Sequence, residues 1–271
     1  MTKVWFVTGS SRGLGRNFVE AALSRGDKVA ATARNPEQLA ELVTAYGDAV
    51  LPLAVDVTDT TAVFESLQRA KEHFGRLDVI VNNAGYGVLA AVEELAEQQL
   101  RDVLETNLFG PLRVVQAAVP ILREQGDGHI IQISSVGGLT AMPLGGAYQA
   151  SKWALEALSE TLAQEVAAFG IKVTIVEPGF YATPGSAGAV HAEVHPLYAD
   201  LRESFATLTQ TLEAADPAAA GRAILKLADV PNPPLRIFFG TQGYPALQQT
   251  YADRLKTWSE WQDLATEAQG T

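Results

Sequence analysis

A glycine-rich turn directly after the first apolar run constrains the fold of this chain more than any other feature. Val4–Val7 reads as a short buried strand, and Thr8–Gly15 joins it to a helical pattern over Gly13–Arg25. Three glycines let the backbone turn sharply and approach a diphosphate, which the amides at the helix N-terminus then bind. The spacing is Gly-x-x-x-Gly-x-Gly rather than Gly-x-Gly-x-x-Gly, but its place after the first strand predicts a dinucleotide site.

Short β-branched runs alternate with helical patterns along almost the whole chain. Strands are expected at Val4–Val7, Lys28–Ala33, Val50–Val55, Leu77–Val81, His129–Ile133, Ile171–Val176 and Arg236–Phe239. Helices are expected at Gly13–Arg25, from Asn35-Pro36 onward, and at about Thr60–Phe74, Glu97–Gln125 and Tyr148–Phe169, with an irregularity at Gly110-Pro111. This order predicts one α/β domain over residues 1–271, a doubly wound sheet of about seven parallel strands with helices on both faces.

Two segments fall outside the alternation. Residues of about 180–215 follow the carboxyl end of the sixth strand, where open α/β sheets bind ligands, so they are expected to form a substrate lid. A C-terminal helical extension is expected over about 244–268. Trp258 and Trp261 within it are expected to anchor an amphipathic tail on the body or on a neighbouring subunit.

Composition excludes several classes of function. The 271 residues carry a formal net charge of -11 and no cysteine. The charge disfavours nucleic-acid and anionic-membrane binding, and the missing thiols exclude disulfides and Cys-based metal sites. His191 and His195 lack a third ligand, so no metal site is expected. The short N-terminal apolar run resembles neither a signal peptide nor a membrane span, and a cytoplasmic location is expected.

The end of the second strand selects the dinucleotide. NAD-selective sites usually place an acid there for the ribose hydroxyls, but this chain has Ala33 followed by Arg34. Arg12 lies in the glycine loop. Two guanidiniums without an opposing carboxylate suit a 2′-phosphate, so the sequence predicts NADP(H).

A phenol and an ammonium four residues apart suggest acid–base chemistry. Tyr148 and Lys152 share one face of a predicted helix, and a nearby cation favours the phenolate form of a tyrosine. Five further motifs accompany this pair along the chain. The motifs are Thr8-Gly9-x-x-x-Gly13-x-Gly15, Asn82-Asn83-Ala84-Gly85, Asn107, Ser135, Tyr148-x-x-x-Lys152 and Pro178-Gly179. In this order and approximate spacing, they resemble the compact, single-domain branch of the short-chain dehydrogenase/reductases.

The resemblance covers about residues 3 to 240 and implies a Rossmann-like sheet with hydride transfer between NADP(H) and a carbonyl or alcohol. It implies Asn107, Ser135, Tyr148 and Lys152 as the catalytic residues. Tyr148 would be the general acid/base, Lys152 would tune it and bond the nicotinamide ribose, Ser135 would hold the carbonyl oxygen, and Asn107 would hold a relay water. The expected cofactor contacts are Gly9, Ser11, Arg12, Gly13, Leu14, Gly15, Arg34, Asp56, Val57, Asn83, Ala84, Gly85, Tyr148, Lys152, Pro178, Gly179, Tyr181 and Thr183.

The side chains expected around the substrate are mostly apolar. The candidate pocket residues are Tyr86, Val136, Met142, Phe180 and Tyr181. No lysine or arginine in Gly179–Ala192 offers a carboxylate or phosphate anchor, which favours an apolar ketone or secondary alcohol. The layout of residues 177–190 is similar to that of the hydroxysteroid and retinol dehydrogenase-like branch.

Alternative functions are a 3-oxoacyl-carrier-protein reductase-like enzyme and a non-catalytic dinucleotide-sensing regulator. The first usually ends soon after the seventh strand, and the second usually loses the Tyr or the Lys. The resemblance also implies a homodimer or homotetramer, paired through helices at about 97–125 and 148–169.

Overall fold

The computed structural model describes residues 2–183, 190–191 and 194–270. Seven parallel strands form the main sheet in the order β3-β2-β1-β4-β6-β7-β9, which confirms the predicted doubly wound α/β fold. The strands are β1 Val4–Val7, β2 Lys28–Ala33, β3 Val50–Ala54, β4 Val79–Asn82, β6 Gly128–Ile133, β7 Ile171–Pro178 and β9 Arg236–Phe239. The strand order reverses between β1 and β4, and this switch point is where such sheets bind ligands.

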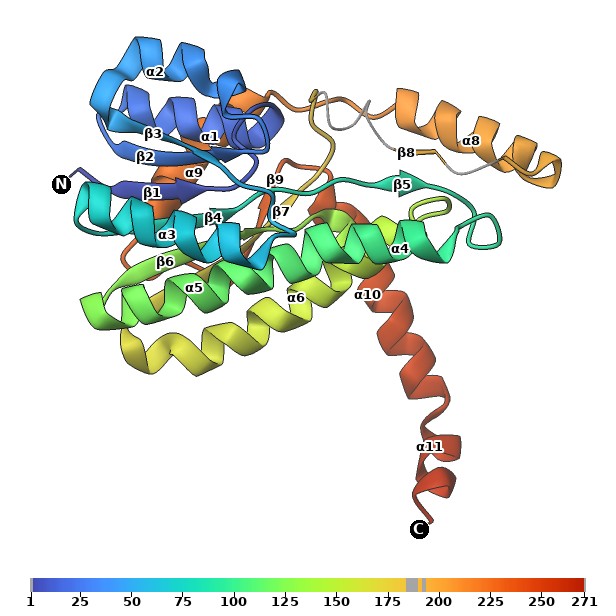
Figure 1. Ribbon diagram of the computed structural model, residues 1–271. Coiled ribbons are helices and arrows are strands. Elements are labelled where there is room, and N and C mark those ends of the chain that lie inside the picture. Colours follow the sequence, from blue (N-terminus) through green and yellow to red (C-terminus); the bar gives the residue numbers. More distant parts are fainter. Residues whose placement is uncertain (1, 184–189, 192–193, 271) are drawn as a thin grey trace.

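Helices cover both faces of the sheet (Figure 1). One face carries α1 Gly13–Ser24, α2 Ala40–Tyr46 and α9 Pro217–Asp229, and the other carries α3 Thr60–Phe74, α5 Gly110–Gln125 and α6 Gly146–Val166. Asn35 caps the turn before α2, with its side chain accepting from the amide of Glu37. Gly75 and Gly126 end α3 and α5 in the left-handed conformation that glycine adopts without strain.

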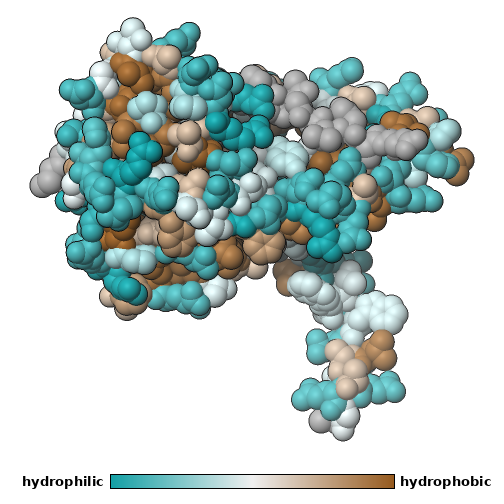
Figure 2. All heavy atoms as spheres, in the orientation of Figure 1, coloured by the Kyte–Doolittle hydropathy of each residue, from teal (hydrophilic) through white to brown (hydrophobic). Residues whose placement is uncertain are grey.

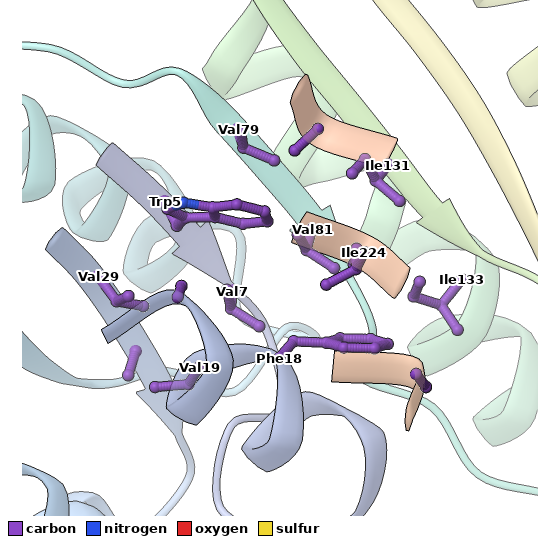
Figure 3. Close-up of a cluster of buried hydrophobic side chains, with 14 of the residues drawn as sticks. Trp5, Val7, Phe18, Val19, Val29, Val79, Val81, Ile131, Ile133 and Ile224 are labelled. Atoms are coloured by element: carbon purple, nitrogen blue, oxygen red, sulfur yellow. The ribbon is translucent and has the colours of Figure 1, made fainter. Parts of the chain in front are cut away.

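Two apolar clusters hold these layers together. The strand side chains alternate between them: Val79 and Val81 face α1 and α9, whereas Ile80 faces α3 and α5. Figure 3 shows the first cluster, where Trp5, Phe18 and Ile224 meet between β1, α1 and α9. Because both faces of the sheet are buried, its strands are apolar along almost their whole length.

Two parts of the chain extend beyond this body. The short strands β5 Val88–Leu89 and β8 Val190–His191 form a second sheet, next to α4 Glu97–Leu104 and α8 Ala199–Gln210 (Figure 1). The helices α10 Gly243–Glu260 and α11 Gln262–Gln269 end the chain. The first part of α10 packs on the body through Leu247 and Arg254, and the remainder forms an arm that projects from it. Trp258 and Trp261 of this arm are 66% and 62% exposed. Figure 2 shows that the end of the arm stands apart from the body.

Candidate active site

The glycine loop presents an uncapped helix N-terminus at the carboxyl edge of the sheet. Gly9 and Gly13 have φ of 68° and 60°, a region that other residues rarely adopt. The first intrahelical bond of α1 runs from Arg16 N to Arg12 O, so the earlier amides have no helical acceptor. Arg12 makes no side-chain cap, and the first turn carries no acidic residue. This N-terminus therefore suits an anion such as a diphosphate.

Two exposed guanidiniums lie at this carboxyl edge of the sheet. Arg12 ends the glycine loop, and Arg34 follows β2 directly. Neither forms an ion pair with any residue that the structure describes. Across the sheet edge, Asp56 accepts from Thr58 N and Thr58 Oγ1 at 2.9 and 2.8 Å, and Val57 is buried against Gly110. This edge of the sheet therefore carries two guanidiniums, Arg12 and Arg34, that no described carboxylate pairs. The Asp56 carboxylate at the same edge is hydrogen-bonded to Thr58.

Asn83 fastens the exit of β4 to the glycine loop. Its Nδ2 donates to the carbonyls of Thr8 and Gly9 at 2.9 and 3.1 Å, and its amide donates to Thr8 Oγ1 at 2.9 Å. The amide of Ala84 donates to the same hydroxyl at 3.0 Å. A Cβ on Gly15 would lie 2.3 Å from both Asn83 Nδ2 and Gly9 O, so only glycine fits there. These contacts hold the exit of β4 against the glycine loop.

Asn107 is fully buried within a π-helical turn, Glu105–Phe109, between α4 and α5. Its side chain clasps the backbone of Tyr86, accepting from the amide at 3.0 Å and donating to the carbonyl at 2.9 Å. It also donates to Ser151 Oγ at 2.9 Å. The helix irregularity expected at Gly110-Pro111 therefore lies one turn earlier, at Glu105–Phe109. There the side chain of Asn107 bonds the backbone of Tyr86, which lies outside the helix.

Ser135 and Tyr148 meet at the ends of β6 and the start of α6. Ser135 Oγ accepts from Gly137 N at 3.0 Å, which fixes its rotamer. Burial raises the pKa of Tyr148, and a hydrogen bond with Ser135 opposes this rise. The ring of Tyr148 lies against Gly87, where a Cβ would approach it to 3.5 Å. The phenol therefore sits in a confined space with the serine as its polar partner.

Lys152 is buried one turn further along α6. Its Nζ donates to the carbonyl of Ile133 at 2.7 Å and lies 5.7 Å from the ring centroid of Tyr148. Burial lowers the pKa of Lys152 to about 8, and Glu156 opposes the fall. A Cβ on Gly85 would lie 3.0 Å from Asn107 Oδ1 and 3.6 Å from Lys152 Nζ. Tyr148, Lys152, Ser135 and Asn107 thus converge on one edge of the sheet.

The segment after β7 closes the site from the far side. Pro178 ends β7, and the amide of Gly179 donates to Phe239 O at 3.0 Å. Thr183 reaches the glycine loop, because a Cβ on Gly13 would lie 3.6 Å from its Cβ. Ser11 and Leu14 are half-buried in that loop, and Leu14 packs on the first apolar cluster.

The expected pocket residues do not all share one environment. Tyr86 is half-buried, with burial raising its pKa. Val136 packs against the start of α10, where a Cβ on Gly243 would lie 2.8 Å from its Cγ2. Tyr181 is buried in the first apolar cluster, and Phe180 binds Ala215 through its backbone. Met142 is 45% exposed. Tyr181 is therefore largely enclosed by apolar side chains, whereas Met142 is open to solvent.

The expected lid segment rests on Glu94 in the loop after β5. Arg202 of α8 forms a salt bridge with this buried carboxylate, and the amide of His195 donates to it at 2.7 Å. The Tyr198 hydroxyl binds Glu93 at 2.6 Å. Residues 184–189 and 192–193 of this segment lie outside the described residues.

Sequence reasoning missed two buried polar groups behind the site. Ser151 links Asn107 to the backbone of Tyr148, donating to its carbonyl at 2.6 Å. Glu156 is only 4% exposed and follows Lys152 by one helical turn. The i, i+4 spacing from Lys152 was the available signal for Glu156.

Within the described ranges, no helix has the length and apolarity to cross a bilayer, and no three His, Asp or Glu side chains cluster as metal ligands.

Comparison with known proteins places this geometry in a family. A family model described as short chain dehydrogenase matches residues 3–193. The chain is 45% identical over 245 residues to Oxidoreductase BOA17 of Botryotinia fuckeliana, which covers 89% of each protein. It is 33% identical over 262 residues to a 3-ketodihydrosphingosine reductase of Bacteroides thetaiotaomicron, covering 94% of this chain and 93% of that protein.

Solved structures agree. A short-chain dehydrogenase from Streptomyces avermitilis superposes with a TM-score of 0.92 and 41% identity, covering 98% of this chain and 99% of that one. A short-chain dehydrogenase from Burkholderia cenocepacia in complex with NADP gives a TM-score of 0.76 and 26% identity, covering 96% and 97%. On the strength of the matched family model and these near full-length relatives, the chain belongs to the short-chain dehydrogenase/reductase family of oxidoreductases.

Proposed function

We propose that the protein is an NADP(H)-dependent carbonyl reductase and alcohol dehydrogenase for an apolar ketone or secondary alcohol. The observation that carries this proposal is the convergence of the Tyr148 phenol, the Ser135 hydroxyl and the Lys152 ammonium at the carboxyl edge of the sheet. This edge also holds the uncapped N-terminus of α1.

The residues at the sheet edge fit NADP(H). The free amides of the glycine loop would hold the diphosphate, and Arg12 and Arg34 would hold the 2′-phosphate. Asp56 and Val57 would flank the adenine, whereas Pro178, Gly179 and Thr183 would lie near the nicotinamide. The NADP complex of the Burkholderia relative supports this choice. When bound, the cofactor supplies or accepts the hydride at the substrate carbon.

The chain's own residues handle the proton and the developing charge. Ser135 donates a hydrogen bond to the carbonyl oxygen, where negative charge grows during reduction. Tyr148 donates its phenolic proton to that oxygen, or takes a proton from the alcohol in the reverse direction. The Lys152 ammonium stabilises the resulting phenolate. Burial raises the pKa of Tyr148, so the phenol is protonated at neutral pH and ready to donate.

The surroundings of the phenol favour an apolar substrate. We propose that Tyr86, Val136, Met142 and Phe180 line the substrate pocket and offer it carbon surface. The Bacteroides protein to which the chain is similar is named a 3-ketodihydrosphingosine reductase, which supports a ketone as the substrate. We further propose a homo-oligomer, with the lid segment of about 180–215 closing over the substrate. A hollow of about 610 Å³ between α3 and α5, next to the exposed Phe64, offers carbon surface to a second copy. The cytoplasmic location stays a prediction.

The test is NADPH consumption against a panel of ketones and aldehydes of rising alkyl and alicyclic size, with Tyr148→Phe as the control. Turnover should rise with apolar bulk, and Tyr148→Phe should lose at least ~10²-fold, the scale for a positioned acid. The variant should bind NADPH as the wild type does. Cofactor binding without turnover on any compound would favour a dinucleotide-sensing regulator.

A further inference from the structure

Three side chains on one face of α6 lie against three consecutive residues at the end of β6. Tyr148 bonds Ser135, and Lys152 bonds the carbonyl of Ile133. Glu156, one turn further, lies beside Ser134. The first two contacts belong to the proposed proton path. The third contact repeats their spacing, and the mechanism above does not use it.

Glu156 is packed tightly beside Ser134. The two side chains are 4% and 3% exposed. A Cβ on Gly138 would lie 2.8 Å from Ser134 Oγ and 3.1 Å from Glu156 Oε1, so both atoms crowd the same glycine. Neither atom has a hydrogen-bond partner in the described part of the chain. Burial raises the pKa of Glu156, and the nearby Ser134 hydroxyl, Arg236 and Lys152 oppose that rise.

A shared arginine balances the charge of Glu156. Arg236 on β9 forms ion pairs with Glu156, with Glu177 on β7 at 3.3 Å and with Glu160 at 2.8 Å. Glu156 and Glu177 are buried, whereas the Glu160 side chain is 52% exposed. With Lys152, the cluster holds two cations and three carboxylates. Burial and Glu156 raise the pKa of Glu177 to about 7, so a proton on Glu177 relieves the excess negative charge.

We propose that Glu156 is a positioning residue for the reaction, its buried carboxylate keeping the Lys152 ammonium charged and bracing Ser134 behind the Ser135 hydroxyl. This inference rests on the proposed roles of Lys152 and Ser135. Burial disfavours the charged form of Lys152, and Glu156 opposes that effect from the same helix face. Without the carboxylate, more of the lysine is neutral at working pH and the phenolate of Tyr148 loses its stabilising cation.

The test is a titration of Lys152 by NMR in protein labelled with 13C at Cε of lysine, assigned with Lys152→Met. It compares wild type with Glu156→Gln and the matched control Glu160→Gln. The control removes a carboxylate that binds the same arginine but is exposed to solvent. Removing a buried opposite charge should lower the pKa of Lys152 by about one unit in Glu156→Gln, and Glu160→Gln should leave it within about 0.2 units.

Kinetics give the second readout. In Glu156→Gln, kcat should fall about tenfold with little change in KM for NADPH. The limb of the pH–rate profile that reports Lys152 should move to lower pH, as the pKa of Lys152 does in the NMR titration. Glu156→Asp, which keeps the charge, should recover part of both. If Glu156→Gln does not fold, Glu156→Met removes the carboxylate at similar length and takes its place.

An unchanged titration of Lys152 in the Gln or Met variant overturns the inference, as does an equal shift in Glu160→Gln. The NMR readout needs no substrate. A wild type that turns over no ketone would therefore contradict the proposed function while the titration still decides the link between Glu156 and Lys152.

Discussion

Arg34 is the side chain proposed to set the preference for NADP(H) over NAD(H). It stands where an NAD-selective relative would carry an acid, it is exposed, and no described carboxylate neutralises it. Arg12 adds a second unpaired guanidinium on the neighbouring loop. A phosphate can therefore bind both without first breaking an ion pair within the protein.

Arg34→Asp should reverse the preference between the two dinucleotides. The ratio of kcat/KM for NADPH to that for NADH should fall by about ten- to a hundredfold, because a hydrogen bond to a charged group is worth about 1.5–3 kcal/mol. Steady-state rates with both cofactors measure it. Arg69→Asp, an exposed arginine on α3, should leave the ratio unchanged. A wild type that prefers NADH contradicts the prediction.

Ser134 and Ser135 differ in what they contact. Ser135 binds the phenol of Tyr148, whereas Ser134 is buried beside Glu156. Ser135→Ala should therefore lower kcat by about 10²-fold, the scale for removing one donor to a developing oxyanion. Ser134→Ala should cost less. Single-turnover rates compare the two, and a larger loss in Ser134→Ala would reverse the assignment.

At the scale of elements, the contact of α6 with β7 and β9 places two buried acids against one arginine. Glu177 is the more perturbed of the two, because burial and the neighbouring Glu156 raise its pKa to about 7. The folded protein thus binds a proton between about pH 4.5 and 7 that the unfolded chain has already lost. Since the folded-state pKa is raised, this group's contribution to stability is fully present below the unfolded value and is lost as pH rises through 7.

Glu177→Gln should make the protein more stable than wild type at pH 8, by on the order of 1–3 kcal/mol, because the amide mimics the protonated acid. The difference should shrink toward zero at pH 5. Urea unfolding at both pH values measures it. Glu160→Gln, which removes an exposed partner of Arg236, should give no gain. A Glu177→Gln variant less stable than wild type at pH 8 would refute the assignment.

At the scale of the whole molecule, the arm of α10 and α11 leaves carbon surface in solvent. Leu255, Trp258, Trp261 and Leu264 are 54–66% exposed, and no residue of α11 is buried (Figure 2). The sequence left two supports open for this tail, the body or a neighbouring subunit. Since the body does not cover it, the second copy in the proposed homo-oligomer is the remaining support.

Trp258→Ser combined with Trp261→Ser should lower the molar mass of the assembly in light scattering. The reason is that two exposed indoles at one contact contribute much of its apolar area. Leu208→Ser on α8, also exposed at 52%, is the matched control and should leave the mass unchanged. A monomeric wild type, or a double variant with unchanged mass, would contradict the role given to the arm.

The sequence by itself determined the order of elements and much of the edge that binds the cofactor. Periodicity and turn residues are local signals, so the bounds of β1, β2, α3 and β9 agree with the predicted ones to the residue. The glycine loop and the spacing of Tyr148 and Lys152 act over one turn of chain, and they could be recognised without a structure.

Only the tertiary structure decided which distant groups meet. Arg236 and Glu156 are 80 residues apart and pair because β9 lies beside β7 at the sheet edge. Asn107 clasps Tyr86 across 21 residues through a π-helical turn that periodicity does not reveal. Tyr181 is buried in the first apolar cluster, and the end of the arm projects from the body. Such outcomes depend on packing and on burial of charge, which sequence distance does not encode.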